Sequence, residues 1–285
     1  EQFFIPGSKS ISQRVLVIHY LSDLNNSIEN LSDSDDTTML YDALYSGKSI
    51  INVKQSGTAL RFLMSVFSLR NINVVLTGSK YLFQRPIVPL IKLLNLLGGS
   101  VHKEKNQIHI KDGSLVGSVL NFNLMYTSQF VSSLLLISPY LKNGLTLNLP
   151  KQSCSQSYIQ MTISIMKYYG AKITVRNNSI HVSNQKYSNS LRFIESDWTS
   201  SSYLFLAFIF SKLNRITIST LYENSIQSDK VVVDFFALIG VRTIFYHNNI
   251  MLEKVKNIVL PKKIEWDFID NPDLFPTMLV ACFGL

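Results

Sequence analysis

The stretch Leu93-Leu94-Asn95-Leu96-Leu97-Gly98 is the first of three similar segments, and their spacing decides the fold class. The other two are Ile165-Met166-Lys167-Tyr168-Tyr169-Gly170 and Phe235-Phe236-Ala237-Leu238-Ile239-Gly240. The three glycines are 72 and then 70 residues apart, and an Asn follows each glycine after eight residues. Three copies with one internal spacing indicate a repeated unit of about 70 residues.

Each copy is typical of a helix followed by a β-hairpin. Glycine has no Cβ atom and can end a helix in the left-handed conformation. Alternating hydrophobic residues then predict two strands joined by a turn. We place the turns at Lys105-Asn106, Asn177-Asn178 and Asn248-Asn249. The period is too long for a solenoid, and it predicts an α/β fold built from copies of one unit.

Polar residues stand before each repeated helix, in Gln84-Arg85-Pro86, Ser155-Gln156-Ser157-Tyr158 and Ser228-Asp229-Lys230. One interpretation is that they cap the helices, with the proline in the first helical turn. The other is that these helix starts point at one shared anion, which free backbone N–H groups attract. The sequence leaves both interpretations open.

Two further stretches have the layout of a loop that opens into a helix. Pro6-Gly7-Ser8-Lys9-Ser10-Ile11-Ser12-Gln13-Arg14 combines a turn, hydroxyls and two cations. Ser56-Gly57-Thr58 leads into Arg61, and its backbone N–H groups could cradle a phosphate or carboxylate. For each stretch an ordinary capped helix is the alternative.

Later segments add polar side chains at helix starts. Thr127-Ser128-Gln129 precedes an apolar helix, and it would suit either capping or a polyoxygenated ligand. Asp273 stands between two prolines, where it is either a cap or a positioned base. The segment 195–203 is expected to be a polar linker into a helix at 204–210, and Asp33-Ser34-Asp35-Asp36-Thr37 is expected to cap a helix.

Composition narrows the class of protein. The 285 residues carry 27 basic and 19 acidic side chains, so the net charge is +8. The basic residues are scattered and lack interleaved aromatics, which favours a small anionic ligand over nucleic acid. No apolar run approaches the roughly 18 residues of a membrane span. Cys154 and Cys282 form neither a disulfide framework nor a metal site. We expect a cytoplasmic monomer without metal or cofactor.

Taken together, these motifs resemble the family of 5-enolpyruvylshikimate-3-phosphate (EPSP) synthases. The resemblance extends over the whole chain and rests on PGSKSISQR from Pro6, SDDT from Ser34, SGTALRF from Ser56, LTG from Leu76 with Arg85-Pro86-Ile87, TSQF from Thr127, SYIQMT from Ser157, SDWTSSSY from Ser196, SDK from Ser228 and DNPDLFPT from Asp270. The sister family, UDP-N-acetylglucosamine enolpyruvyl transferase, normally has Lys-Asn where this chain has Lys9-Ser10. It remains the alternative, together with a binding-only protein or inactive fragment that keeps the shikimate-phosphate pocket.

The resemblance implies a two-domain, inside-out α/β barrel of repeated βαβαββ units, of the EPT/RTPC-like type. Residues 1–8 with 196–285 would form the first domain, incomplete at its C-terminal part. Residues 9–195 would form the second domain, with three units. The implied reaction transfers the enolpyruvyl group of phosphoenolpyruvate to the 5-hydroxyl of shikimate 3-phosphate and releases phosphate.

The resemblance also implies a role for individual residues. Lys9 and Asp273 match catalytic residues, Lys9 touching both substrates and Asp273 taking the proton of the 5-hydroxyl. The residues that match the shikimate 3-phosphate site are Lys9, Ser10, Arg14, Thr127, Ser128, Gln129, Ser155, Tyr158 and Asp273. Those that match the phosphoenolpyruvate site are Lys9, Gly57, Arg61, Arg85 and Gln129. Family members continue past this Asp with further cations, so we expect a truncated sequence whose activity by itself is doubtful.

Overall fold

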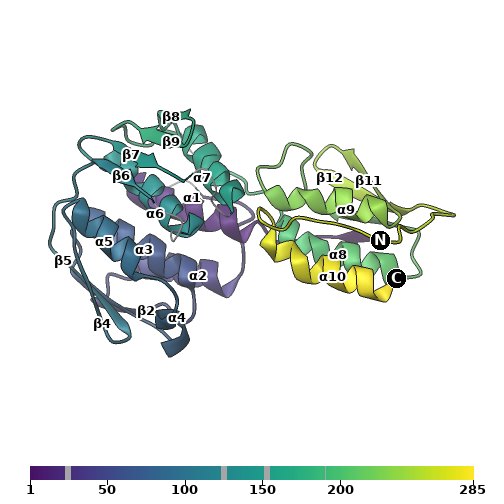
Figure 1. The fold of residues 1–285 in the computed structure, drawn as a ribbon, viewed down its shortest axis with the longest axis horizontal. Helices are drawn as coiled ribbons and strands as arrows, with labels where there is room; N and C mark the ends of the chain where they lie inside the picture. Colours follow the sequence, from purple (N-terminus) through teal and green to yellow (C-terminus); the bar gives the residue numbers. More distant parts are fainter. Residues whose placement is uncertain (23–26, 123–126, 151–154, 190) are drawn as a thin grey trace.

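The computed structural model describes residues 1–22, 27–122, 127–150, 155–189 and 191–285. Figure 1 shows two lobes side by side. We call residues 9–195 the large lobe and residues 1–8 with 196–285 the small lobe. Cys154 lies outside the described residues.

The large lobe contains two units of the same construction, each with a four-stranded mixed sheet. The first sheet has the order β2-β3-β5-β4 and the second β6-β7-β9-β8. In each, the first two strands are parallel and the last two form an antiparallel hairpin. The first unit consists of β2 (Ile50–Asn52), α3 (Gly57–Leu69), β3 (Val74–Thr77), α4 (Lys80–Gln84), α5 (Val88–Leu96), β4 (Ser100–Glu104) and β5 (Gln107–Lys111). The second consists of β6 (Val119–Asn121), α6 (Ser128–Ile137), the 3-10 turn η1 (Ser138–Tyr140), β7 (Leu145–Asn148), α7 (Gln156–Tyr168), β8 (Ile173–Arg176) and β9 (Ser179–Val182).

The small lobe repeats this plan, but its first strand comes from the N-terminus. Strand β1 pairs in parallel with β10, with Gln2 opposite Thr217, in a sheet of the order β1-β10-β12-β11. The lobe consists of β1 (Gln2–Phe3), α8 (Trp198–Phe210), β10 (Arg215–Ser219), η2 (Ser228–Val231), α9 (Val232–Leu238), β11 (Val241–Tyr246), β12 (Asn249–Lys254), η3 (Pro272–Leu274) and α10 (Phe275–Gly284). Helices α1 (Lys9–Ser22) and α2 (Asp35–Tyr45) complete the large lobe.

The repeat predicted from the sequence is present. Gly98, Gly170 and Gly240 have φ values of 99°, 87° and 96°, so each follows its helix in the left-handed region. A hairpin comes after each glycine. The third turn lies at His247-Asn248, one residue earlier than predicted. His247, Lys105 and Asn177 occupy equivalent places, since all three also have positive φ.

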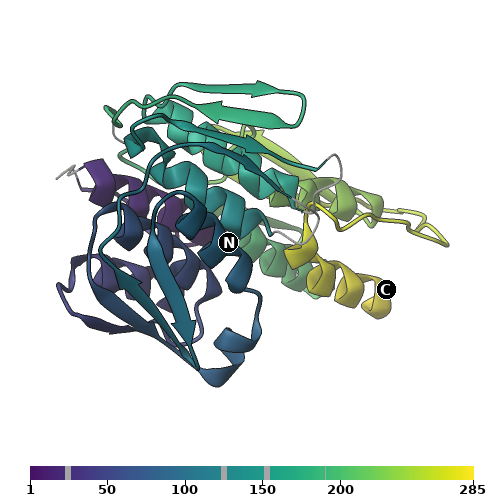
Figure 2. The same ribbon diagram turned by 60° about the vertical axis from the view of Figure 1, so that its left-hand side comes forward.

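Helices form the interior of the large lobe and the sheets lie outside them. Eight of the 10 residues of α6 and 11 of the 13 residues of α3 are buried. Figure 2 shows the helices between the β8–β9 hairpin at the top and the β2–β5 sheet at the lower left. This arrangement agrees with the inside-out α/β fold, although the sheets do not close into a continuous barrel.

The buried hydrophobic side chains form two separate clusters. One contains residues from Ile11 to Ile194 and the other Ile5 with residues from Trp198 to Ala281. The chain crosses between the lobes twice, around Gly7 and around Ser196, and the two crossings are bridged as antiparallel strands. We propose that residues 9–195, and residues 1–8 with 196–285, are two domains hinged at these crossings. Of the three units expected in 9–195, two are complete, and α1 with α2 stands in the place of the third.

Several local expectations were wrong. Helix α8 begins at Trp198, so the polar linker ends earlier than predicted, because Asp197 caps the helix through the N–H of Ser200 at 2.7 Å. Pro86 lies before α5, and Pro89 occupies its first turn. The N-cap positions of α5, α7 and α9 have no side-chain capping bond.

Within the described ranges, no helix combines the length and apolarity that a membrane span needs.

Gly7 fits the first crossing because it has no side chain. A Cβ atom there would overlap the backbone carbonyl of Asn30, which is held by the Asn30 amide's bond to Ile194 at 2.8 Å. We therefore expect Gly7→Ala to lower the free energy of unfolding by about 2–3 kcal/mol, as overpacking does. Urea denaturation measures this. Gly47→Ala is the control, because no atom lies within 4 Å of a Cβ atom added there and only the φ of 63° is unfavourable. It should lower the free energy of unfolding by about 1 kcal/mol. An equal loss in both variants would contradict the prediction.

Candidate active site

Two arginines meet the start of α3. A Cβ atom on Gly57 would lie 2.5 Å from Nη1 of Arg61 and 2.7 Å from Nη1 of Arg85. Both guanidinium groups therefore lie against the glycine at the first turn of the helix. Ser56 caps this helix through the N–H of Ala59 at 3.3 Å. The remaining N–H groups and the two cations form an arrangement that attracts anions.

Arg61 is buried, and no carboxylate among the described residues forms an ion pair with it. Its side chain is only 2% exposed, and its Nη1 and Nη2 donate to the carbonyls of Gly57 at 2.7 Å and Pro86 at 3.0 Å. Its Nε is buried and has no hydrogen-bond partner in the described part of the chain. Burial, and then the charge of Arg85, lower the pKa of Arg61 to about 10. Arg61 therefore stays cationic at neutral pH.

Arg14 is a second buried cation, and it joins three helices of the large lobe. It is 3% exposed. From α1 its Nε donates to Thr162 of α7 at 2.7 Å, and its Nη2 to Ser132 of α6 and to the carbonyl of Tyr158, both at 3.4 Å. Its Nη1 donates to the carbonyl of Ser10 at 2.7 Å. Burial lowers the pKa of Arg14 to about 10. Among the described residues no carboxylate forms an ion pair with it.

Lys9 is the first residue of α1 and lies beside the crossings between the lobes. Its backbone N–H donates to Oδ2 of Asp197, at the start of α8, at 3.1 Å. Its Nζ pairs with Asp36, in the first turn of α2. Ser34 caps α2 as predicted, but Asp36 adds the ion pair to Lys9, which the structural interpretation of that motif did not include.

Helix α6 contacts both buried arginines, Arg61 and Arg14, near its start. The ring of Phe130, which follows Gln129, is 5.4 Å from the Arg61 guanidinium, and Ser132 accepts from Arg14. Thr127 is exposed at the N-cap, while Ser128 and Gln129 are half-buried. Ser155 precedes α7 in the left-handed conformation, with φ of 57°, and its N–H donates to the carbonyl of Ile269 at 3.2 Å.

The start of α7 also contacts the small lobe. The hydroxyl of Tyr158 donates to Oδ2 of Asp273 at 2.8 Å, and Ser157 donates to the carbonyl of Asp270 at 2.8 Å. Burial first, and then the charges of Asp229 and Asp273, raise the pKa of Tyr158. Asp273 itself is exposed. The predicted base thus faces the large lobe through a direct hydrogen bond.

These contacts bring distant motifs to one region between the lobes, where the starts of several helices gather. Lys9 reaches α8, Arg14 reaches α6 and α7, and Tyr158 reaches Asp273. No contact among the described residues joins Ser155 or Thr127 directly to Lys9. Within the same residues no cluster of His, Cys, Asp or Glu could hold a metal ion.

Comparison with known proteins agrees with the family resemblance seen in the sequence. The sequence profile of EPSP synthase (3-phosphoshikimate 1-carboxyvinyltransferase) matches residues 43–283. The chain belongs to the EPSP synthase family. The 3-phosphoshikimate 1-carboxyvinyltransferase of Bacteroides fragilis is 36% identical over 98% of this chain, which covers 68% of that protein. The one from Methanospirillum hungatei is 33% identical over 97% of this chain and 71% of its own length.

Solved structures of the family share the fold. EPSP synthase from Acinetobacter baumannii superposes with a TM-score of 0.76 at 17% identity, covering 99% of this chain and 70% of that chain. A second EPSP synthase structure from the same organism superposes with a TM-score of 0.75 at 17% identity, covering 99% of this chain and 71% of that chain. The predicted family and fold class are therefore confirmed.

Some residues of the site were missed by sequence reasoning. Thr162 in α7 and Ser132 in α6 hold Arg14, and the sequence analysis gave neither residue a role. Asp229 accepts from Thr199 and, at 3.0 Å, from Asn271, and burial raises its pKa. A hydroxyl at a helical spacing of one turn from a site residue, as Thr162 is from Tyr158, is the signal that could have found the first of these.

Proposed function

We propose that this chain transfers the carboxyvinyl group of phosphoenolpyruvate to the 5-hydroxyl of shikimate 3-phosphate and releases phosphate. The observation that carries the proposal is the pair of buried guanidiniums, Arg14 and Arg61, neither of which has a carboxylate partner in the part of the chain that the structure describes. Burying an unpaired charge is unfavourable, and a bound anion would remove that penalty. Both substrates carry a phosphate and a carboxylate.

We assign shikimate 3-phosphate to the space at the starts of α1, α6 and α7. Arg14, with Lys9 and Ser10, comes from α1, and the half-buried Ser128 and Gln129 come from α6. Thr127, Ser155 and Tyr158 complete this group. Hydroxyl and amide groups pair with the ring hydroxyls and phosphate of such a ligand, while a guanidinium matches its carboxylate.

We assign phosphoenolpyruvate to Gly57, Arg61 and Arg85, with Lys9 and Gln129 between the two ligands. Arg85 is exposed, so its guanidinium can close on the anion with both outer nitrogens. Arg61 contributes its charge from below the helix start, and its buried Nε adds a donor without a partner. The α3 dipole acts in the same direction.

In the proposed reaction the 5-hydroxyl oxygen attacks the enol carbon of phosphoenolpyruvate, and Asp273 accepts the hydroxyl proton. The methylene carbon gains a proton, which gives a tetrahedral intermediate. Loss of phosphate with a proton from the methyl group then regenerates the double bond. Tyr158 orients Asp273 through its hydrogen bond of 2.8 Å. Lys9 would leave Asp36 to stabilise the developing negative charge. The reacting groups meet between the lobes, and we infer that the lobes act as one monomeric unit.

Titration calorimetry with shikimate 3-phosphate tests the proposal. Gln129→Ala is expected to weaken its binding about tenfold, because a hydrogen bond to a charged group contributes about 1.5–3 kcal/mol. Gln160→Ala is the matched control, since Gln160 is exposed on α7 outside this group, and should bind as the unchanged chain does. Absence of binding by the unchanged chain, or equal loss in both variants, would refute the assignment.

A further inference from the structure

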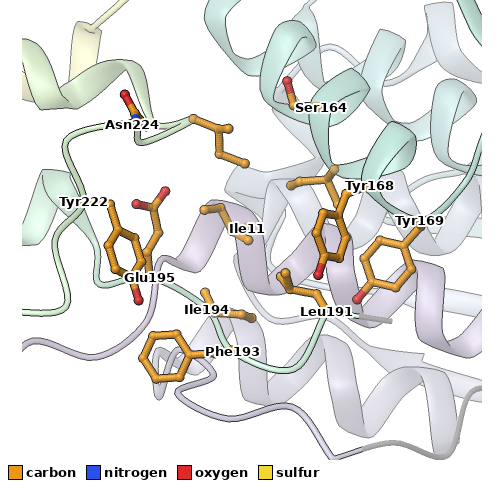
Figure 3. Close-up of a pocket in the computed structure, with 12 residues that line it drawn as sticks. Ile11, Ser164, Tyr168, Tyr169, Leu191, Phe193, Ile194, Glu195, Tyr222 and Asn224 are labelled. Atoms are coloured by element: carbon orange, nitrogen blue, oxygen red, sulfur yellow. The ribbon is translucent and has the colours of Figure 1, made fainter. Parts of the chain in front are cut away.

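A pocket lies beside the crossings between the lobes, and its lining includes Ile11 and Glu195. Its volume is about 250 Å³. Figure 3 shows Tyr168 and Tyr169 on one side of it, Tyr222 and Glu195 on the other, and Ile11 between them. Tyr168 is the last residue of α7, ten residues beyond Tyr158. At 1.5 Å per helical residue, that places it roughly 15 Å from the candidate active site.

The walls of this pocket come from both lobes. Helices α1 and α7 and the segment 191–195 belong to the large lobe, and the loop 222–226 belongs to the small lobe. Most of the lining is apolar or aromatic, with Leu191, Phe193 and Ile226 added to the side chains of Figure 3. A pocket of this size holds a single ring with a short side chain, because a cavity of about 150 Å³ already binds benzene.

Glu195 is the one charged residue in the lining. It is 8% exposed. Its Oε1 accepts from Ser225 at 2.8 Å, but its Oε2 is buried without a hydrogen-bond partner in the described part of the chain. The nearby Gln227 amide donates instead to the carbonyl of Ser196 at 2.9 Å. A buried carboxylate oxygen without a donor is unfavourable unless something supplies one.

The surroundings of Glu195 disfavour its unpaired anion, which a bound cation would stabilise. Burial is the largest cause and raises the pKa of Glu195, the hydrogen bond from Ser225 offsets only part of this, and the charge of Asp197 raises the pKa further. The lining contains no Lys or Arg. Among the described residues that line the pocket, a cation would therefore meet the carboxylate of Glu195 and no basic side chain.

We propose that this pocket binds a small aromatic amine, with its ammonium group on Oε2 of Glu195 and its ring among Tyr168, Leu191 and Phe193. The ammonium supplies the missing donor, and the face of Tyr222 adds a cation–π contact. The ring replaces water against apolar walls. Because the walls come from both lobes beside the crossings, an occupied pocket holds the lobes in one relative position.

The probe is 2-phenylethylamine, with 2-phenylethanol as the neutral compound of the same shape. For a ligand of about nine heavy atoms we expect a dissociation constant on the order of a millimolar. Titration followed by amide NMR shifts should show 2-phenylethylamine binding at least about tenfold more tightly than 2-phenylethanol. The shifts should be largest at Tyr168, Leu191 and Ile226.

Two variants complete the test. Glu195→Gln keeps the size and the Ser225 contact but removes the charge, and it should lose the preference for the amine. Glu223→Gln removes a charge from an exposed position of the same loop and should keep it. Equal affinity for the two compounds, or shifts confined to other residues, overturns the proposal. The comparison in the unchanged chain decides the matter if Glu195→Gln does not fold.

Discussion

Phosphoenolpyruvate binds about 10- to 100-fold more weakly to Arg85→Ala, whereas shikimate 3-phosphate binds as before, if the candidate site is assigned correctly. Arg85 lies against Gly57 and is exposed, so its removal deletes charge and donors without opening a hole in the core. Loss of one charge-assisted hydrogen bond costs about 1.5–3 kcal/mol. Calorimetry with each ligand, phosphoenolpyruvate being titrated in the presence of shikimate 3-phosphate, measures both effects.

Two further variants make this experiment specific. Gly57→Ala keeps both arginines but places a methyl group against Nη1 of each, so it should weaken the same ligand and not the other. Lys92→Ala removes a positive charge from an exposed position of α5 and should change neither affinity. If Arg85→Ala weakens both ligands equally, Arg85 does not belong to a separate phosphoenolpyruvate site.

The repeated helix and hairpin could be predicted from the sequence because they depend on local chemistry. A glycine with positive φ after each helix, and a hairpin turn seven residues later, follow from rules that act within about ten residues. Strand β1 shows the limit of such rules. Its partner β10 is more than 200 residues away, with Phe3 opposite Ile218. For this chain only the resemblance to a known family joined residues 1–8 to the small lobe.

The candidate site could be predicted in its residues but not in their contacts. Lys9, Arg14 and Arg61 were predicted as site cations near helix starts, and the sequence could not tell that Arg14 and Arg61 are buried. Arginine is ordinarily exposed. Its burial here depends on the packing of α1, α3, α6 and α7, which no spacing in one segment reveals. The hydrogen bond between Tyr158 and Asp273 joins the two lobes, and it could not be predicted either, because it depends on how the lobes pack.

The buried Arg14 has opposite consequences for stability and for binding. Burial lowers the pKa of Arg14 from its usual value to about 10, so keeping the charge in the folded protein costs about 3 kcal/mol, since one pKa unit is 1.36 kcal/mol. Thr162 donates to Ser132 at 2.9 Å, and we expect this hydrogen bond to remain when the arginine is replaced. Replacing a buried ionic group with an apolar side chain of similar size is often stabilising.

We therefore expect Arg14→Met to raise the free energy of unfolding by about 1–2 kcal/mol, with part of the 3 kcal/mol offset by lost hydrogen bonds. The penalty in the unchanged chain is complete below pH 10 and falls as the pH rises through the folded pKa of about 10 towards the usual pKa of arginine. The difference between the two chains should therefore shrink above pH 10. Urea denaturation at pH 7 and pH 10.5 measures both values.

The same variant should lose at least about 30-fold in affinity for shikimate 3-phosphate, because removing one member of a buried charge pair costs about 2–5 kcal/mol. Arg14→Lys separates charge from geometry, since an ammonium keeps the charge without the planar fork that reaches α6 and α7 together. It should be no more stable than the unchanged chain and bind with intermediate affinity. A stability loss of 1 kcal/mol or more in Arg14→Met, with binding retained, would make Arg14 a structural tie between helices and would leave the ligand's carboxylate without its assigned partner.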